Sequence, residues 1–177
     1  VEGEIGTLSG IEDNVEVEDK DARFTNPKEA KQFVMQTGVN SVAVAIGTSH
    51  GAYKFSGEPK LRIDILSEIE KELGKFPIVL HGASTVDAKI VRQINARGGK
   101  IKGAKGVSPK ELALICSEHN VCKVNVDTDL RLCFIASLRK NLKASPKEIN
   151  PRFFLSDARE EMKNLVISKI KLFQGNL

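Results

Sequence analysis

The sequence predicts an α/β fold built on a parallel sheet. Short apolar runs of strand length alternate along the chain with amphipathic stretches of helical period, which is the pattern of repeated βα units. No low-complexity linker separates these segments. A chain of 177 residues is long enough to bury one sizeable core, so we expect residues 1–177 to form a single domain.

Four segments are the predicted strands. Two of them are continuous apolar runs, the last is a mainly apolar run that includes Lys123 and Asn125, and the first alternates Glu2 and Glu4 with smaller residues. Each ends in glycine or in polar residues, which typically terminate strands. The segments are residues 1–6, 42–46, 78–80 and 121–126.

Helices are predicted between and after these strands. Asn26-Pro27 supplies a cap and a first-turn proline, and Gly38 ends the helix that they begin. Ser108-Pro109 repeats the same start signal. Apolar residues on one helical face predict two further helices, within residues 61–73 and 158–173.

Composition excludes several classes of partner. The net charge of +4 comes from dispersed basic residues and aromatic content is only 5%, so nothing indicates binding to nucleic acid. No apolar run approaches the roughly 20 residues of a membrane span. Three cysteines without CxxC spacing favour a reduced, cytoplasmic compartment. Because the chain begins at Val1, inside a strand-like motif, we expect it to be truncated.

Two of the chain's three histidines follow successive predicted strands. His50 and His81 come after apolar runs, and each is followed by glycine. Neighbouring parallel strands are about 4.8 Å apart, so their ends can bring two imidazoles onto one metal ion. Glu4, at the end of the preceding strand, would supply an oxygen ligand, and such a set suits zinc or a similar divalent ion. His119 lies near a helix end and is interpreted as a surface residue.

Glycine-containing loops surround these histidines. Residues 47–51 and 81–84 offer backbone N–H groups and hydroxyls without bulky side chains, and such loops cradle phosphate oxygens. Lys54 adds a positive charge nearby. Beside metal ligands, these loops favour a phosphorylated substrate.

The last predicted strand ends in Asn125-Val126-Asp127-Thr128-Asp129. Asn125 and Asp127 share one strand face, so both can point at one ligand. Asp129 is interpreted as the cap of the following helix. Arg131 can either reach an anion or form a surface ion pair, and both interpretations stay open.

Together these motifs resemble the class II fructose-bisphosphate aldolases of the shorter type. The resemblance runs from Val1 to Phe173 and rests on VEGEIGTLSGIED, AIGTSHGAYKF, GEPKL, VLHGAS, GGKIKGAKGV and KVNVDTDLR, in this order. Tagatose-bisphosphate aldolases are similar. The resemblance implies the TIM (β/α)8 barrel, of which this chain would hold only about the last four βα units, the C-terminal half.

The resemblance further implies a zinc-dependent lyase of glycolysis and gluconeogenesis. In this family the metal polarises the carbonyl of dihydroxyacetone phosphate and stabilises the enediolate that condenses reversibly with glyceraldehyde 3-phosphate. Glu4, His50 and His81 match metal-binding residues, and Glu12 matches the mobile acid that exchanges a proton with the substrate. By itself the acidic stretch from Gly10 to Asn26 has the pattern of a solvated surface loop. The family also binds a monovalent cation, Na⁺ or K⁺, near the phosphate.

The resemblance also assigns contacts to substrate and to a second subunit. Arg131 resembles the arginine that binds the distal phosphate of fructose 1,6-bisphosphate. Arg152 matches one that reaches the neighbouring subunit's site, which implies a homodimer or tetramer. The residues that match the dihydroxyacetone phosphate site are Gly51, Lys54, Gly82, Ser84, Asn125, Asp127 and Thr128.

The front of the family's barrel has no counterpart in this sequence. Absent are the strands with the first metal histidine, the adjacent general-base Asp and an early Ser that binds the distal phosphate. We therefore expect a truncated aldolase chain that is inactive by itself. Three alternatives stay open: a tagatose-bisphosphate aldolase, a non-catalytic half-barrel that binds metal or phosphate, and another metal-dependent barrel lyase or hydrolase.

Overall fold

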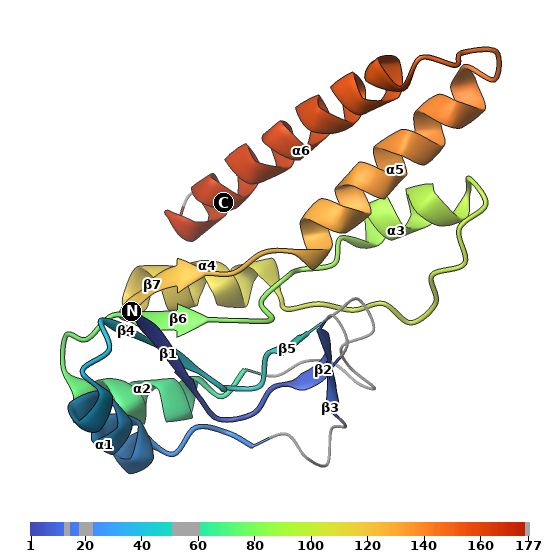
Figure 1. Ribbon diagram of the computed structural model, residues 1–177. Coiled ribbons are helices and arrows are strands. Elements are labelled where there is room, and N and C mark those ends of the chain that lie inside the picture. The colour runs from blue at the N-terminus through green and yellow to red at the C-terminus, as the bar shows by residue number, and fades with distance from the viewer. Residues whose placement is uncertain (13–14, 18–22, 51–60, 176–177) are drawn as a thin grey trace.

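The computed structural model describes residues 1–12, 15–17, 23–50 and 61–175, with the backbone alone at 9–12, 15–17 and 50. Within them the main sheet has four parallel strands, in the order β1-β4-β6-β7 (Figure 1). The strands are β1 (Glu2–Ile5), β4 (Ser41–Val44), β6 (Ile78–Leu80) and β7 (Val121–Val124). The predicted α/β fold with a parallel sheet is confirmed, and the complete (β/α)8 barrel stays a prediction.

Six helices lie within the described residues: α1 (Pro27–Thr37), α2 (Ile63–Leu73), α3 (Ala88–Asn95), α4 (Pro109–Glu118), α5 (Thr128–Ala144) and α6 (Pro151–Phe173). The end signals of α1 act as predicted. Asn26 Oδ1 accepts hydrogen bonds from the backbone N–H groups of Lys28 at 3.0 Å and Glu29 at 3.2 Å. Gly38 ends α1 in the left-handed conformation, with a φ of 65°.

A small second sheet lies beside the end of the main one. It contains β2 (Ser9–Glu12), β3 (Val15–Val17) and β5 (Ser49–His50), in the order β3-β2-β5. The interpretation of Gly10 to Asn26 as a surface loop is therefore wrong for its first part. The alternating Val-Glu-Val of β3 pairs antiparallel with β2, and β2 gains a second partner, β5, from far along the chain.

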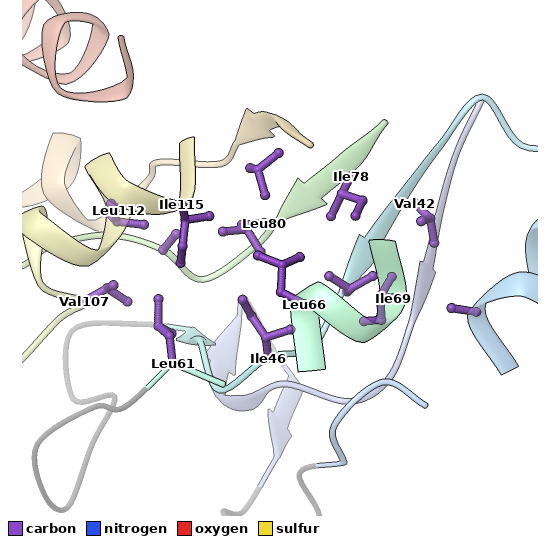
Figure 2. Packing of buried hydrophobic residues seen from close by; sticks show 14 residues of the cluster. Val42, Ile46, Leu61, Leu66, Ile69, Ile78, Leu80, Val107, Leu112 and Ile115 are labelled. Carbon is purple, nitrogen blue, oxygen red and sulfur yellow. The ribbon is translucent and has the colours of Figure 1, made fainter. Parts of the chain in front are cut away.

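The main hydrophobic core lies between the sheet and the helices that cover one of its faces. Figure 2 shows side chains of β4 and β6, such as Val42, Ile78 and Leu80, packed against those of α2 and α4. Successive side chains of a strand point to opposite faces. The residues that alternate with these apolar side chains therefore point to the other face of the sheet. That face carries Glu2, Glu4 and His81.

The helices α5 and α6 pack against each other as an antiparallel pair that extends away from the sheet (Figure 1). Ala158 and Leu172 of α6 are buried, whereas Val166 and Ile170 are about half exposed. Among the described helices, none combines the length and the apolar character needed to cross a membrane.

Candidate functional site

The polar residues predicted from the sequence gather at the carboxyl ends of the parallel strands. Glu4 lies near the end of β1, His81 directly follows β6, and Asn125 directly follows β7. The backbone N–H of Asn125 donates to the Leu80 carbonyl oxygen at 2.9 Å, which continues the pairing of β7 with β6 beyond the regular strand. Because all four strands run in the same direction, their carboxyl ends lie together at one end of the sheet.

His81 lies between two carboxylates of β1. Its Nδ1 is 3.3 Å from Glu4 Oε1, and its Nε2 is 3.1 Å from Glu2 Oε1. Glu2 and Glu4 can both reach the ring because residues two apart on a strand share a face. The structure therefore brings Glu4 and His81 together.

Glu2 is also paired with a lysine of the last strand. Lys123 Nζ lies 2.9 Å from Glu2 Oε2, so this ion pair joins β1 to β7 across the polar face of the sheet. The hydrogen bond from Lys123 is the main cause that holds the pKa of Glu2 below its ordinary value, and His81 adds to it against a desolvation effect that raises the pKa. The sequence analysis assigned no role in the site to Glu2 or Lys123. Each lies two residues from a predicted site residue on the same strand, Glu2 from Glu4 and Lys123 from Asn125, and so shares its face.

The segment that carries His50 packs directly against the residue after His81. Gly82 has a φ of 60°, and a Cβ built on it would come within 2.6 Å of the Ser49 carbonyl oxygen. In β5, His50 is also paired with Gly10 of β2. The two histidine-bearing segments are thus neighbours through their backbones. The predicted residues Gly51 and Lys54 lie outside the described residues.

A buried hydroxyl marks the loop just before His50. Thr48 is 3% exposed, and its Oγ1 has no hydrogen-bond partner within the part of the chain that the structure describes. Leaving a buried hydroxyl unsatisfied costs about 1–3 kcal/mol, so this atom needs a partner that the described residues do not supply. This loop is one of the two that the sequence predicts to contact phosphate.

The loop after β6 is held by a carboxylate that sequence reasoning misinterpreted. Asp129 lies within the first turn of α5, and the predicted cap role is wrong because Asp127 occupies the cap position. Its oxygens accept hydrogen bonds from the backbone N–H groups of Thr85 at 2.9 Å and Val86 at 2.7 Å. Ser84, next to them, is buried. Asp129 therefore links this loop to the start of α5.

The start of α5 carries three of the predicted substrate residues. Asp127 occupies the cap position, Thr128 is the first helical residue, and Arg131 lies one turn on. Among the described residues, Asp127 makes no side-chain cap hydrogen bond. Its Oδ2 is instead 2.8 Å from Arg131 Nε, in a pair in which both side chains are about two-thirds exposed. Of the two interpretations of Arg131, the structure shows the surface pair.

Arg152 and His119 lie away from these strand ends. Arg152 is exposed in the first turn of α6, at the end of the α5–α6 pair that is far from the sheet (Figure 1). The 17 residues of α5 span about 25 Å, which separates Arg152 from the strand ends of its own chain. His119 precedes β7, and its Nδ1 is 2.8 Å from Glu70 Oε2. The prediction of His119 as a surface residue is only partly right, because its side chain is partly buried and 11% exposed.

The sequence matches the family described as "Fructose-bisphosphate aldolase class-II" over residues 1–176. It is 47% identical to a fructose-bisphosphate aldolase of Thermus caldophilus, a match that covers 98% of this chain and 56% of the relative. A fructose-bisphosphate aldolase of Helicobacter pylori is also 47% identical, over 97% of this chain and 55% of the relative. The chain thus spans about half the length of these curated relatives.

Solved structures show the same relationship. A crystal structure of a Coccidioides immitis protein, assigned as a fructose-1,6-bisphosphate aldolase, has a TM-score of 0.69 and 25% identity. That match covers 99% of this chain and 52% of the other. The YdjI aldolase of Escherichia coli K12 matches 87% of this chain and 45% of its own, with a TM-score of 0.61; at 23% identity it supports the fold alone.

Proposed function

This chain belongs to the class II fructose-bisphosphate aldolase family, and we propose that it forms the C-terminal half of an aldolase that cleaves fructose 1,6-bisphosphate. Its four parallel strands and their helices would be half of the eight βα units of a TIM barrel. Residues 1–177 would then be one structural unit, completed by strands that precede Val1 in a longer chain. The length of the curated relatives, about twice that of the match, supports this proposal.

The proposal depends most on one observation, the approach of Glu4 to His81. Two ligands that each bind zinc at 2.0–2.1 Å in tetrahedral geometry lie about 3.3 Å apart. Glu4 Oε1 and His81 Nδ1 are 3.3 Å apart, and they are the oxygen and nitrogen donors that zinc prefers. The two side chains therefore fit adjacent positions around a divalent metal ion.

These two donors are not a complete site. Among the described residues, no three His, Cys, Asp or Glu side chains converge closely enough to hold a metal ion. We propose His50 as the third ligand, because its segment packs against Gly82, and a histidine upstream of Val1 as the fourth donor. Glu2 would orient the His81 ring by accepting from Nε2, which turns Nδ1 toward Glu4.

When bound, the metal would polarise the carbonyl of the substrate. The other residues would bind the phosphate and move a proton. The phosphate of dihydroxyacetone phosphate would be held by Gly82 and Ser84, together with Gly51 and Lys54. Its other polar oxygens would be held by Asn125, Asp127 and Thr128.

Glu12 would exchange a proton with the reacting carbon, as the acid of a loop that closes over the substrate. The pairing of β2 with β5 supports this role, because Gly10 lies opposite His50 and Glu12 follows two residues later on the same strand. The backbone thus leads Glu12 toward the same end of the sheet as the proposed metal ligands.

We propose that the two arginines contact the distal phosphate from different subunits. Arg131 is close to the strand ends, and its exposed pair with Asp127 is worth at most about 1 kcal/mol, so a phosphate can displace it. Arg152, in the first turn of α6, lies too far from the strand ends to reach the same site of its own chain. In a homodimer or tetramer, Arg152 of one subunit would instead contact the phosphate in the site of another subunit.

The metal assignment is tested by His81→Ala in the full-length protein that contains this chain. We expect the variant to lose bound zinc and aldol cleavage of fructose 1,6-bisphosphate, because a ligand of the metal is removed. Metal content is measured by atomic emission and cleavage by a coupled assay. His119→Gln is the matched control, since its side chain bonds Glu70 at the opposite end of β7. Normal zinc content and turnover in His81→Ala would refute the assignment.

A further inference from the structure

A buried carboxylate joins three segments of the chain behind the loop that follows β6. Asp129 is 3% exposed. Its Oδ2 accepts from the Thr85 backbone N–H at 2.9 Å and from the Thr85 hydroxyl at 3.0 Å, while its Oδ1 accepts from the Val86 N–H at 2.7 Å. Lys169 of α6 completes the cluster, with its Nζ 2.6 Å from Asp129 Oδ2.

The cluster satisfies the polar groups that it buries. Lys169 Nζ also donates to the Thr85 hydroxyl at 2.6 Å, so this hydroxyl accepts from the lysine and donates to the carboxylate. A buried ion pair contributes little net stability compared with apolar residues of the same shape, because desolvation offsets its attraction. The hydrogen bonds of the cluster are directional, so they do fix the relative positions of the groups that they join. The cluster therefore controls the conformation of the loop.

The backbone of the loop is strained at the point where Asp129 holds it. Val86 has a φ of 50°, a left-handed conformation that a β-branched residue rarely adopts. Such a conformation costs about 1–3 kcal/mol and persists only where the surroundings enforce it. The two amide groups bound by Asp129 belong to Val86 and to the residue before it. The carboxylate thus holds the two peptide groups on either side of the Thr85 Cα, directly before the strained Val86.

The loop is also held from its other side. A Cβ on Gly106 would come within 2.4 Å of the Ser84 carbonyl oxygen, so the segment of Gly106 lies directly against the loop. The backbone N–H of Val107 donates to that same carbonyl at 3.1 Å. Ser84, the proposed phosphate ligand, therefore lies between two fixed segments.

We propose that Asp129, held by Lys169, is a positioning residue for the substrate's phosphate. It sets the geometry of the Gly82–Ser84 loop relative to Asp127 and Thr128, which lie two residues and one residue before it at the start of α5. Phosphate oxygens are bound by groups fixed in position, so a small shift between these two segments weakens every contact at once. This inference rests on the proposed function, because the loop is a phosphate site only if the chain is an aldolase.

The experiment compares Asp129→Asn and Lys169→Met with the wild type in the full-length protein. Calorimetry measures the affinity for dihydroxyacetone phosphate in the zinc-loaded protein and, separately, the affinity for zinc in the metal-free protein. We expect each substitution to weaken dihydroxyacetone phosphate binding by about tenfold or more, because a charged hydrogen bond to the loop is lost, and to leave zinc affinity unchanged. The double variant should be no weaker than either single variant, since the two residues act as one unit.

Glu160→Gln is the matched control, because Glu160 lies on the same helix as Lys169 and forms an exposed pair with Lys163 at 2.9 Å. It should change neither affinity. If Asp129→Asn does not fold, Thr85→Val is used in its place, since it removes the bridging hydroxyl and keeps both charges. The same selective loss of phosphate affinity is expected, by about threefold or more.

Three outcomes would overturn the inference in distinguishable ways. Unchanged dihydroxyacetone phosphate binding in the variants, with normal binding in the wild type, would refute the positioning role alone. Equal losses of zinc and phosphate affinity would show a general structural role instead. Failure of the wild-type protein to bind dihydroxyacetone phosphate would refute the proposed function and this inference with it.

Discussion

Two carboxylates, Glu2 and Asp129, hold other residues of the site in place, and each is paired with a lysine. Glu2 contacts His81 and Lys123 on the partly open face of the sheet. Asp129 contacts Lys169 in the interior, where an uncompensated charge is far more costly. Loss of a partner should therefore affect mainly local orientation at Glu2, and both orientation and stability at Asp129.

The stability of the protein should depend on the ionisation of Asp129. Burial acts to raise its pKa, but the Lys169 ammonium and the amides of Thr85 and Val86 outweigh it, so the pKa lies below the ordinary value of 3.8. A carboxyl with a lowered folded pKa stabilises the fold above its unfolded pKa of about 3.9, and this contribution disappears as the pH falls through the folded pKa. Below about pH 4 the wild type should lose stability more steeply than Asp129→Asn.

Urea unfolding at a series of pH values measures this difference. Between about pH 5 and 8 the two proteins should differ in free energy of unfolding by a constant amount, and the difference should shrink at lower pH. Parallel curves down to about pH 2 would mean that the Asp129 carboxyl titrates alike in the folded and unfolded states.

The sequence could not reveal the role of Asp129. The pattern Asp127-Thr128-Asp129 before a helix is a cap signal, and either aspartate satisfies it locally. The deciding contacts come from Thr85 and Lys169, which lie far away in sequence. The approach of Glu4 to His81 was predictable for the opposite reason, since strand ends in a parallel sheet converge whatever the helices do.

At the scale of elements, the helix caps differ in a way that mutation can measure. Asn26 accepts two backbone N–H groups at the start of α1. Asn26→Ala should lower the free energy of unfolding by about 1 kcal/mol. Ser108 occupies the same position of α4 but, within the described residues, makes no side-chain cap hydrogen bond, so Ser108→Ala should cost less than about 0.5 kcal/mol. Chemical denaturation gives both values, and equal losses would contradict the assigned cap geometry.

Sequence reasoning located the elements whose signals are local. The strands of the main sheet follow from apolar runs or, for β1, from alternation. The starts of α1 and α4 follow from Pro27 and Pro109. It missed α3, which has only 8 residues, and the small sheet. Strand β5 has only two residues and depends on pairing with β2 rather than on its own pattern, so no period in the sequence could indicate it.

At the scale of the whole molecule, β1 and β7 form the two edges of the described sheet. Exposed strand edges tend to pair with other segments. In the proposed barrel, these edges would pair with the strands that precede Val1. The polar face that bears Glu4 and His81 would then become the inside of the barrel.

This arrangement predicts complementation between two half-chains. Residues 1–177 alone should show no aldol cleavage, because the proposed site lacks a metal ligand and its general base. Co-expression with the amino-terminal half of the Thermus caldophilus relative should restore cleavage, since that half would supply both and pair with β1 and β7. A coupled assay on the co-purified halves measures the activity, with His81→Ala in this chain as the inactive control. Activity of residues 1–177 by themselves would contradict the half-site proposal.

The order of strands in the sheet also bears on how the chain folds. Glu2 pairs with Ser41, Val42 with Ile78, and Ile78 with Val121, so each pairing closes a loop of roughly 40 residues. A sheet assembled from such successive, moderately short loops has a lower contact order than one that joins the ends of its chain. During synthesis on the ribosome, each new βα unit can dock on the one just completed, and the core can grow without waiting for a distant segment.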